Sequence, residues 1–194
     1  MSRNNNEEIK NLREEKISRK EIFNGAIVHL TLDSVKLPDG NTATREVAWH
    51  KGAVCVVPLT ESGEIILERQ FRYPFDDVIT EIPAGKMDKT EENPEEAARR
   101  ELLEETGYTA KEMIFIGSYY PSPAILSEKI YMYVAKGLEK HKQKLDEDEF
   151  LEVFSVPFEE AVNLILENSI PDGKTQTAVL KAYNLMLKGD LHIN

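Results

Sequence analysis

The chain of 194 residues is 41% hydrophobic and 30% charged, which is the composition of a folded globular protein with room for one domain and a smaller appendage. Its net charge of −11 argues against nucleic acid and anionic membranes as partners attracted by bulk electrostatics. No apolar run approaches the roughly 20 residues of a membrane span, and a single cysteine fits a reducing compartment, so we expect a cytoplasmic protein.

Residues 1–48 predict a small antiparallel β unit. Residues 6–20 are polar and predict a frayed helix or a disordered segment, but apolar residues recur from residue 21 onward. Two strands are expected over residues 21–38 and a third over residues 42–49, with the turn Pro38-Asp39-Gly40 between them. A unit of about thirty residues is too small to bury its own core. It must therefore lean on the next domain or on another subunit.

Residues 49–194 predict a larger α/β domain. The nearly continuous apolar run 52–59 predicts a central strand. Further strands are expected over residues 64–70, 78–82, 113–119, 129–135 and 150–156, and residues 136–148 are expected to form a charged loop. One helix is expected from residue 94 to 106, and two amphipathic helices over residues 157–168 and 175–187 are expected to pack on the core. This order predicts a mixed sheet with helices on both faces.

Three acidic side chains share one face of the first of these helices. At about 100° per residue, Glu101, Glu104 and Glu105 fall within a face roughly 100° wide. Such carboxylates repel one another unless a cation lies among them, and Mg²⁺ or Mn²⁺ with oxygen ligands is the natural occupant. The alternative is a solvated face with ordinary Glu–Arg pairs four residues apart, as at Glu96 and Arg100.

The order of the residues decides between these alternatives. Residues 100–108, RELLEETGY, resemble the second half of the Nudix box, and Glu92 matches the glutamate of its first half. There is one departure, because the segment between Gly85 and Glu92 is one residue longer than in the family pattern. Either the loop carries an insertion, or Glu91 replaces Glu92.

The resemblance implies a Nudix-type α/β/α sandwich and hydrolysis of a nucleoside diphosphate linked to another moiety. It implies that Glu101, Glu105 and the carbonyl of Ala84 are metal ligands. Glu104 is implied to be a further ligand or a base. Arg100 is implied to hold the box carboxylates by ion pairing rather than to touch the substrate.

A finer resemblance is to the ADP-ribose pyrophosphatases. Pro123 follows the box at a spacing that resembles the mark of these enzymes, although an ordinary loop proline is the alternative. The N-terminal β unit resembles theirs, which is exchanged across a homodimer and helps to close the partner's substrate site. The implied reaction is Mg²⁺-dependent hydrolysis of ADP-ribose to AMP and ribose 5-phosphate, with Mn²⁺ as an alternative metal. Other readings are a pyrophosphatase for GDP-mannose or NADH, and a non-catalytic ADP-ribose-sensing module.

The same resemblance suggests residues outside the box. In the acidic run 146–149, Glu147 is the candidate general base and Glu149 an additional metal ligand, with Glu104 as the competing base. A solvated run of acids is the alternative. Arg72 is a candidate phosphate or ribose contact, and Arg45 and Glu46 match family positions that reach ADP-ribose.

Overall fold

The computed structural model describes residues 12–87, 92–145 and 149–192, which form two compact units. The first contains the described residues up to His50 together with Ser122–Glu128, and the second contains Lys51–Pro121 and the described residues from Lys129 onward. The sequence predicts a boundary after residue 48 and places residues 122–128 in the larger domain, whereas the structure groups these residues with the N-terminal unit. No helix in the described ranges is long and apolar enough to cross a membrane.

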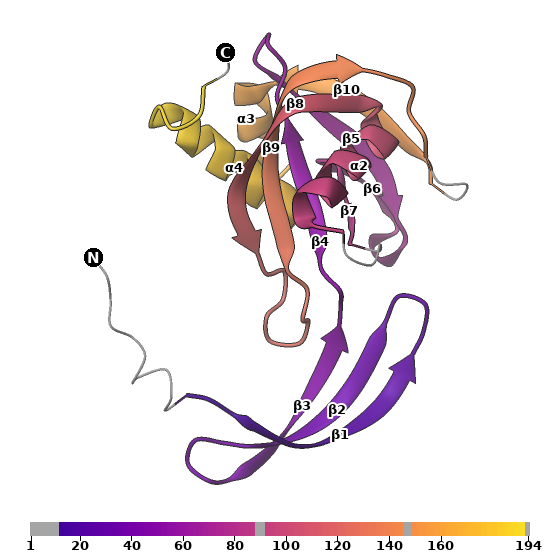
Figure 1. Cartoon of the computed structure of the whole chain (residues 1–194), viewed down its shortest axis with the longest axis vertical. Helices are drawn as coiled ribbons and strands as arrows, with labels where there is room; N and C mark the ends of the chain where they lie inside the picture. The colour runs from indigo at the N-terminus through magenta and orange to yellow at the C-terminus, as the bar shows by residue number, and fades with distance from the viewer. Residues whose placement is uncertain (1–11, 88–91, 146–148, 193–194) are drawn as a thin grey trace. The chain divides into compact units, whose positions relative to one another are not determined.

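The first unit is a three-stranded antiparallel sheet in the order β1-β2-β3 (Figure 1). Its strands are β1 (Glu15–Asn24), β2 (His29–Lys36) and β3 (Thr42–Trp49). The expected helix or disorder is wrong for residues 15–20, because β1 already begins at Glu15. This polar strand is held by charge pairing across the sheet. Arg19 lies opposite Asp33, donates to it from Nε at 2.8 Å, and stacks over Trp49.

Two sheets form the second unit. A four-stranded mixed sheet has the order β7-β4-β9-β8, with β4 and β9 parallel and the other neighbours antiparallel. Its strands are β4 (Ala53–Pro58), β7 (Ala84–Lys86), β8 (Tyr108–Tyr119) and β9 (Ile130–Lys140). An antiparallel sheet in the order β10-β5-β6 contains β5 (Glu64–Arg72), β6 (Asp77–Glu81) and β10 (Leu151–Pro157).

Strands β8 and β9 are longer than the sequence predicts. Their antiparallel register runs from the pair Tyr108–Lys140 to the pair Tyr119–Ile130, so the loop expected from residue 136 starts only after Lys140. Charged side chains at this end pair across the strands, as Lys111 and Glu139 do at 3.4 Å. The polarity of residues 136–140 predicts a loop, but pairing of their charged side chains with those of β8 allows them to form a strand.

Helices cover both faces of the mixed sheet (Figure 1). Along β4, Cys55 and Val57 pack with residues of α3 (Phe158–Leu166) and α4 (Gly173–Leu187). Val54 and Val56 face the other way and pack with α2 (Pro94–Thr106). The α/β/α sandwich is therefore confirmed. Burial raises the pKa of the Cys55 thiol to about 12, so it is a core side chain and not a nucleophile.

The sequence around α2 fixes both of its ends. Asn93 caps the first turn, accepts a hydrogen bond from the backbone N–H of Glu96, and forms a capping box with that residue. Gly107 ends the helix in the left-handed conformation at φ 72°, where glycine is favoured. A Cβ at residue 107 would also meet the His141 carbonyl oxygen at 2.8 Å. The helix thus presents residues 101–105 in a fixed register.

Candidate active site

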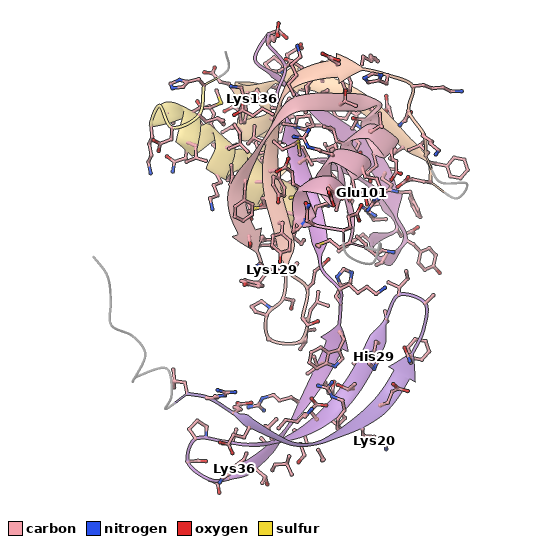
Figure 2. The ribbon with its side chains drawn as sticks, viewed as in Figure 1. Lys20, His29, Lys36, Glu101, Lys129 and Lys136 are labelled. Atoms are coloured by element: carbon pink, nitrogen blue, oxygen red, sulfur yellow. The ribbon has the colours of Figure 1, made fainter. Side chains whose placement is uncertain are left out.

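Glu101 lies directly against the backbone of β7, the short strand that precedes the box helix. It projects from α2 (Figure 2) and is 9% exposed. Gly85 is placed beside it by pairing with Val54 on the central strand. A Cβ at residue 85 would overlap the Glu101 carboxylate. Glycine at this position therefore leaves the room in which that carboxylate sits.

Arg100 links the carboxylates of this site. Its Nε and Nη2 donate to the two oxygens of Glu92 at 2.9 and 3.1 Å. Its Nη1 donates to Glu101 at 2.7 Å and to Glu104 at 3.0 Å. A further bond from Nη2 reaches the carbonyl oxygen of Lys86 at 3.1 Å. The guanidinium of Arg100 is thus engaged by three carboxylates and one backbone carbonyl of the site.

Glu105, four residues after Glu101 on α2, is buried beside Ala84. It is 3% exposed, and one of its oxygens accepts a hydrogen bond from the Ala84 backbone N–H at 2.8 Å. Burial, then the charges of Glu68 and Glu101, raise the pKa of Glu105. Burial also raises the pKa of Glu101, and Arg100 opposes this. Two buried acids held side by side favour a cation between them or a proton on one of them.

Arg72 is held at the end of β5 by one carboxylate. Its Nε and Nη2 donate to the two oxygens of Glu81 at 2.6 and 2.7 Å. Glu81 also accepts from Lys174, and Lys174 pairs with Asp172 at 3.0 Å. These residues line a cavity of about 430 Å³ together with Phe75, Asp77, Ile79, Pro171 and Gly173.

The chain that leads to the acidic run is attached to the end of α2. The backbone N–H of His141 bonds to the Gly107 carbonyl at 2.6 Å, and that of Lys144 bonds to the Glu104 carbonyl at 3.0 Å. Burial is the main cause of the raised pKa of Glu101 and of Glu105, and the charge of Glu149 adds to it. Glu147 lies outside the described residues.

The remaining candidate substrate residues belong to the first unit. Arg45 pairs with Glu14, and its Nε donates at 3.0 Å. Glu46 is exposed on β3. Pro123 is exposed in the segment 122–128, which bonds to the edge of β3. The structure therefore groups Arg45, Glu46 and Pro123 in one unit and the box residues in the other.

Comparison with known proteins identifies the second unit. A family model described as NUDIX domain matches residues 49–176. The chain belongs to the Nudix family. An ADP-ribose pyrophosphatase of Bacillus subtilis (strain 168) is 43% identical over 173 residues, covering 88% of this chain and 93% of the relative. A methanol dehydrogenase activator of Bacillus methanolicus is 44% identical over 168 residues, covering 86% and 90%.

More distant relatives differ in their named substrate. A GDP-mannose pyrophosphatase of Yersinia enterocolitica is 35% identical over 133 residues, covering 64% of this chain and 69% of the relative. The solved structure of an ADP compounds hydrolase matches with a TM-score of 0.82 at 21% identity, covering 93% of this chain and 98% of that one. At this identity the likeness supports the fold alone.

The contacts of Arg100 indicate which glutamate belongs to the Nudix box, given the extra residue between Gly85 and Glu92. Glu92 takes the bidentate pair with Arg100, so it occupies the position from which the first half of the box reaches the second. Glu91 lies outside the described residues. The contact favours Glu92 as the box glutamate, with the additional residue in the segment that precedes it.

The oxygen donors of the Nudix box suit a hard divalent cation. Among the side chains that the structure describes, no group of three or more Asp, Glu, His or Cys encloses a metal position. Mg²⁺ does not need such a cage, since it is usually held by one or two carboxylates with water and substrate phosphates. The buried carboxylates of Glu101 and Glu105 beside the Ala84 backbone meet this requirement.

Three charged residues near the Nudix box were missed by the sequence reasoning. Glu68 is 1% exposed, and its Oε2 has no hydrogen-bond partner in the described residues. Glu81 and Lys174 form the network that holds Arg72. A signal existed for Glu68, because it lies four residues before Arg72 and so points to the same face of the strand.

Proposed function

We propose that this Nudix protein hydrolyses the pyrophosphate link of ADP-ribose to AMP and ribose 5-phosphate, with Mg²⁺ as its metal and Mn²⁺ as the alternative. The observation that carries the proposal is the full set of box carboxylates: Arg100 pairs with Glu101 and Glu104, and Glu105 is held by the Ala84 backbone N–H. The 43% identity to an ADP-ribose pyrophosphatase supports the substrate.

In the proposed mechanism, Glu101, Glu105 and the Ala84 carbonyl would hold the metal, and Glu149 would contribute a further carboxylate. When bound, the divalent cation supplies positive charge to the pyrophosphate oxygens and lowers the pKa of the attacking water. Arg100 keeps the carboxylates of Glu101 and Glu104 in place. Positioned charge of this kind is the main source of rate enhancement in phosphoryl transfer.

Water attack at phosphorus breaks one P–O bond of the pyrophosphate link, and a base must accept the proton that water loses. Glu104 and Glu147 are the two candidates. Glu104 accepts from Arg100 at 3.0 Å through Oε2, and its side chain is 35% exposed. Glu147 lies in the acidic run that follows the segment anchored on α2. Comparing the pH profiles of Glu104→Gln and Glu147→Gln assigns the role, because loss of the base removes the lower-pH limb.

We also propose a homodimer in which the N-terminal unit is exchanged. Support comes from the large apolar side chains that this unit leaves uncovered, Ile17, Ile22, Phe23, Ile27 and Val28, which are 47–61% exposed. The partner's copies of Arg45, Glu46 and Pro123 would then meet the substrate held by the box and Arg72. Light scattering at two concentrations tests this, because an exchanged dimer keeps its mass on dilution.

A substrate panel tests the activity. Purified protein with Mg²⁺ is assayed with ADP-ribose, GDP-mannose and NADH, and the substrates are ranked by kcat/KM. ADP-ribose is expected to rank first, and Glu105→Gln is expected to lose at least about 100-fold in kcat. A higher rank for GDP-mannose would transfer the function to the substrate named for the Yersinia relative. Binding of ADP-ribose without turnover at saturating Mg²⁺ would instead indicate a sensing module.

A further inference from the structure

Four charged side chains form a continuous row beside the Nudix box. Arg72 pairs with Glu81, Glu81 with Lys174, and Lys174 with Asp172. The two central members are the most buried, with side chains of Glu81 and Lys174 exposed by 3% and 13%. Because two cations alternate with two anions, the row has no net charge. Each inner group is fixed from both sides.

The first turn of α4 anchors this row to the fold. Asp172 caps the helix by accepting from the Thr175 backbone N–H at 2.9 Å. The Thr175 hydroxyl oxygen accepts from the backbone N–H of Ile82, also at 2.9 Å. The start of α4 therefore binds the side chain of Glu81 through Lys174 and the backbone of Ile82 through Thr175. Ile82 lies two residues before Ala84.

One end of the row is open. Nε and Nη2 of Arg72 are used by Glu81, and Nη1 makes no hydrogen bond within the described residues. The Arg72 side chain is 37% exposed and lines the cavity of about 430 Å³. A guanidinium held on one edge and free on the other can donate to an oxygen of a ligand in a fixed direction.

We propose that Lys174 is a positioning residue for substrate binding: acting through Glu81, it holds Arg72 in the orientation from which Nη1 contacts an oxygen of the nucleotide sugar. This inference rests on the proposed hydrolysis of a nucleotide sugar. Without Lys174, the Glu81 carboxylate is held, among the described residues, only by Arg72. The Arg72 guanidinium, which is bound to that carboxylate, is then no longer kept in one orientation.

The first test is the kinetics of Lys174→Met. KM for ADP-ribose is expected to rise about tenfold with kcat within about twofold, because the contact is made in the bound substrate as well as in the transition state. Lys174→Arg, which keeps the charge, is expected to recover part of the loss. Lys181→Met, at an exposed position on the same helix, is the matched control and should leave KM unchanged. An unchanged KM in folded Lys174→Met overturns the proposal.

A second variant separates position from charge. Lys174→Met leaves the row with one negative charge, and Asp172→Asn leaves it with one positive charge. By charge alone, the first would weaken and the second would strengthen binding of an anionic substrate. By positioning, both raise KM, since Asp172 is the group that fixes Lys174 from outside. Asparagine preserves the helix cap, so this variant decides the matter even if Lys174→Met does not fold. A lower KM in Asp172→Asn would contradict positioning.

A third measurement does not depend on the substrate. In protein labelled with [¹⁵N]arginine, the Nε–H signal of Arg72 is assigned by its loss in Arg72→Lys. Its exchange with solvent is expected to be slow in the wild type and about tenfold faster in Lys174→Met, because the bond to Glu81 opens more often. Equal exchange rates would overturn the proposal. If the wild type hydrolyses none of the nucleotide sugars, the proposed function fails, and this rate still decides whether Lys174 holds Arg72.

Discussion

Glu68 and Glu81 lie directly opposite each other on β5 and β6, and both carboxylates are buried. Glu81 is bound by Arg72 and Lys174, which outweigh its burial and lower its pKa. Glu68 has an oxygen without a partner among the described residues, and burial together with the charge of Glu81 raises its pKa. The surroundings of these two neighbouring carboxylates therefore shift their pKa values in opposite directions.

This difference predicts a pH-dependent stability of the metal-free protein. The unfolded chain releases the Glu68 proton in the ordinary carboxyl range, whereas the folded chain retains it to higher pH. Above the unfolded pKa the folded state therefore binds more protons, and the free energy of unfolding falls as pH rises, by up to about 1.4 kcal/mol per pH unit and group. Urea unfolding in EDTA at several pH values between about 5 and 8 should show this fall.

The variant Glu68→Gln tests which group is responsible. Glutamine keeps the shape and has no titration, so the slope of stability against pH is expected to be shallower than in the wild type. Burial also raises the pKa of Glu101 and of Glu105, and these two groups contribute the remaining slope. Glu159→Gln, at a surface position on α3, serves as the control and should preserve the full slope. Identical slopes for Glu68→Gln and the wild type would contradict the assignment.

The box helix and the sandwich could be predicted because their signals are local. Asn93, Pro94 and Gly107 fix the ends of α2 through backbone preferences, and the spacing of Glu101 and Glu105 then follows from helix geometry. The apolar run of β4 needs burial on both faces, which requires helices on both sides.

What could not be predicted depends on partners far apart in the chain. Arg19 and Asp33 make β1 a strand although its sequence is polar. The spacing of Glu68 from Arg72 could have shown that the two share a face of β5, but only the fold shows that Glu68 is buried. Lys174 lies 93 positions from Glu81, and no periodicity relates the two. Propensity describes a residue and its neighbours, whereas these contacts are created by strand pairing and helix packing.

Gly85→Ala is expected to damage the site more than the fold. The added methyl group would overlap the Glu101 carboxylate, which must then shift from the position in which it accepts from Arg100 Nη1 at 2.7 Å. We expect a fall of about 100-fold or more in kcat with a change in Tm of only a few degrees. A double-mutant cycle with Glu101→Gln checks the cause. If the glycine acts through Glu101, adding Gly85→Ala to Glu101→Gln costs little more, and additive losses would point to another cause.

Divalent metal is expected to stabilise the folded protein. A cation between Glu101 and Glu105 relieves the repulsion of two buried acids whose pKa values are raised. At a free metal concentration of 100 times Kd, the gain is about 2.7 kcal/mol. Thermal unfolding over a series of Mg²⁺ and Mn²⁺ concentrations measures it. Glu105→Gln should lose most of the shift, whereas Glu159→Gln should retain it. A shift that survives in Glu105→Gln would place the metal elsewhere.

Arg100→Lys tests whether the box depends on the forked geometry of arginine. The guanidinium bonds to Glu92 through two nitrogens and to Glu101 and Glu104 through the third, and its side chain is 16% exposed. A lysine has the charge but only one nitrogen, so it cannot hold these carboxylates together. We expect metal affinity, followed by Mn²⁺ titration with paramagnetic resonance, to fall about tenfold, since residues that orient ligands have effects of this size.

Arg99→Lys supplies the comparison from the adjacent position. Arg99 pairs with Glu95 at 3.0 Å and donates from Nη1 to the Ala110 carbonyl at 2.7 Å, so in the described structure neither bond reaches a box carboxylate. A partly exposed ion pair of this kind contributes only a few tenths of a kcal/mol. Its replacement should leave Mn²⁺ affinity within about twofold of the wild type. If Arg99→Lys and Arg100→Lys weakened Mn²⁺ equally, general helix stability would be the cause. A loss confined to Arg100→Lys means that metal binding requires one guanidinium to orient the carboxylates of the box.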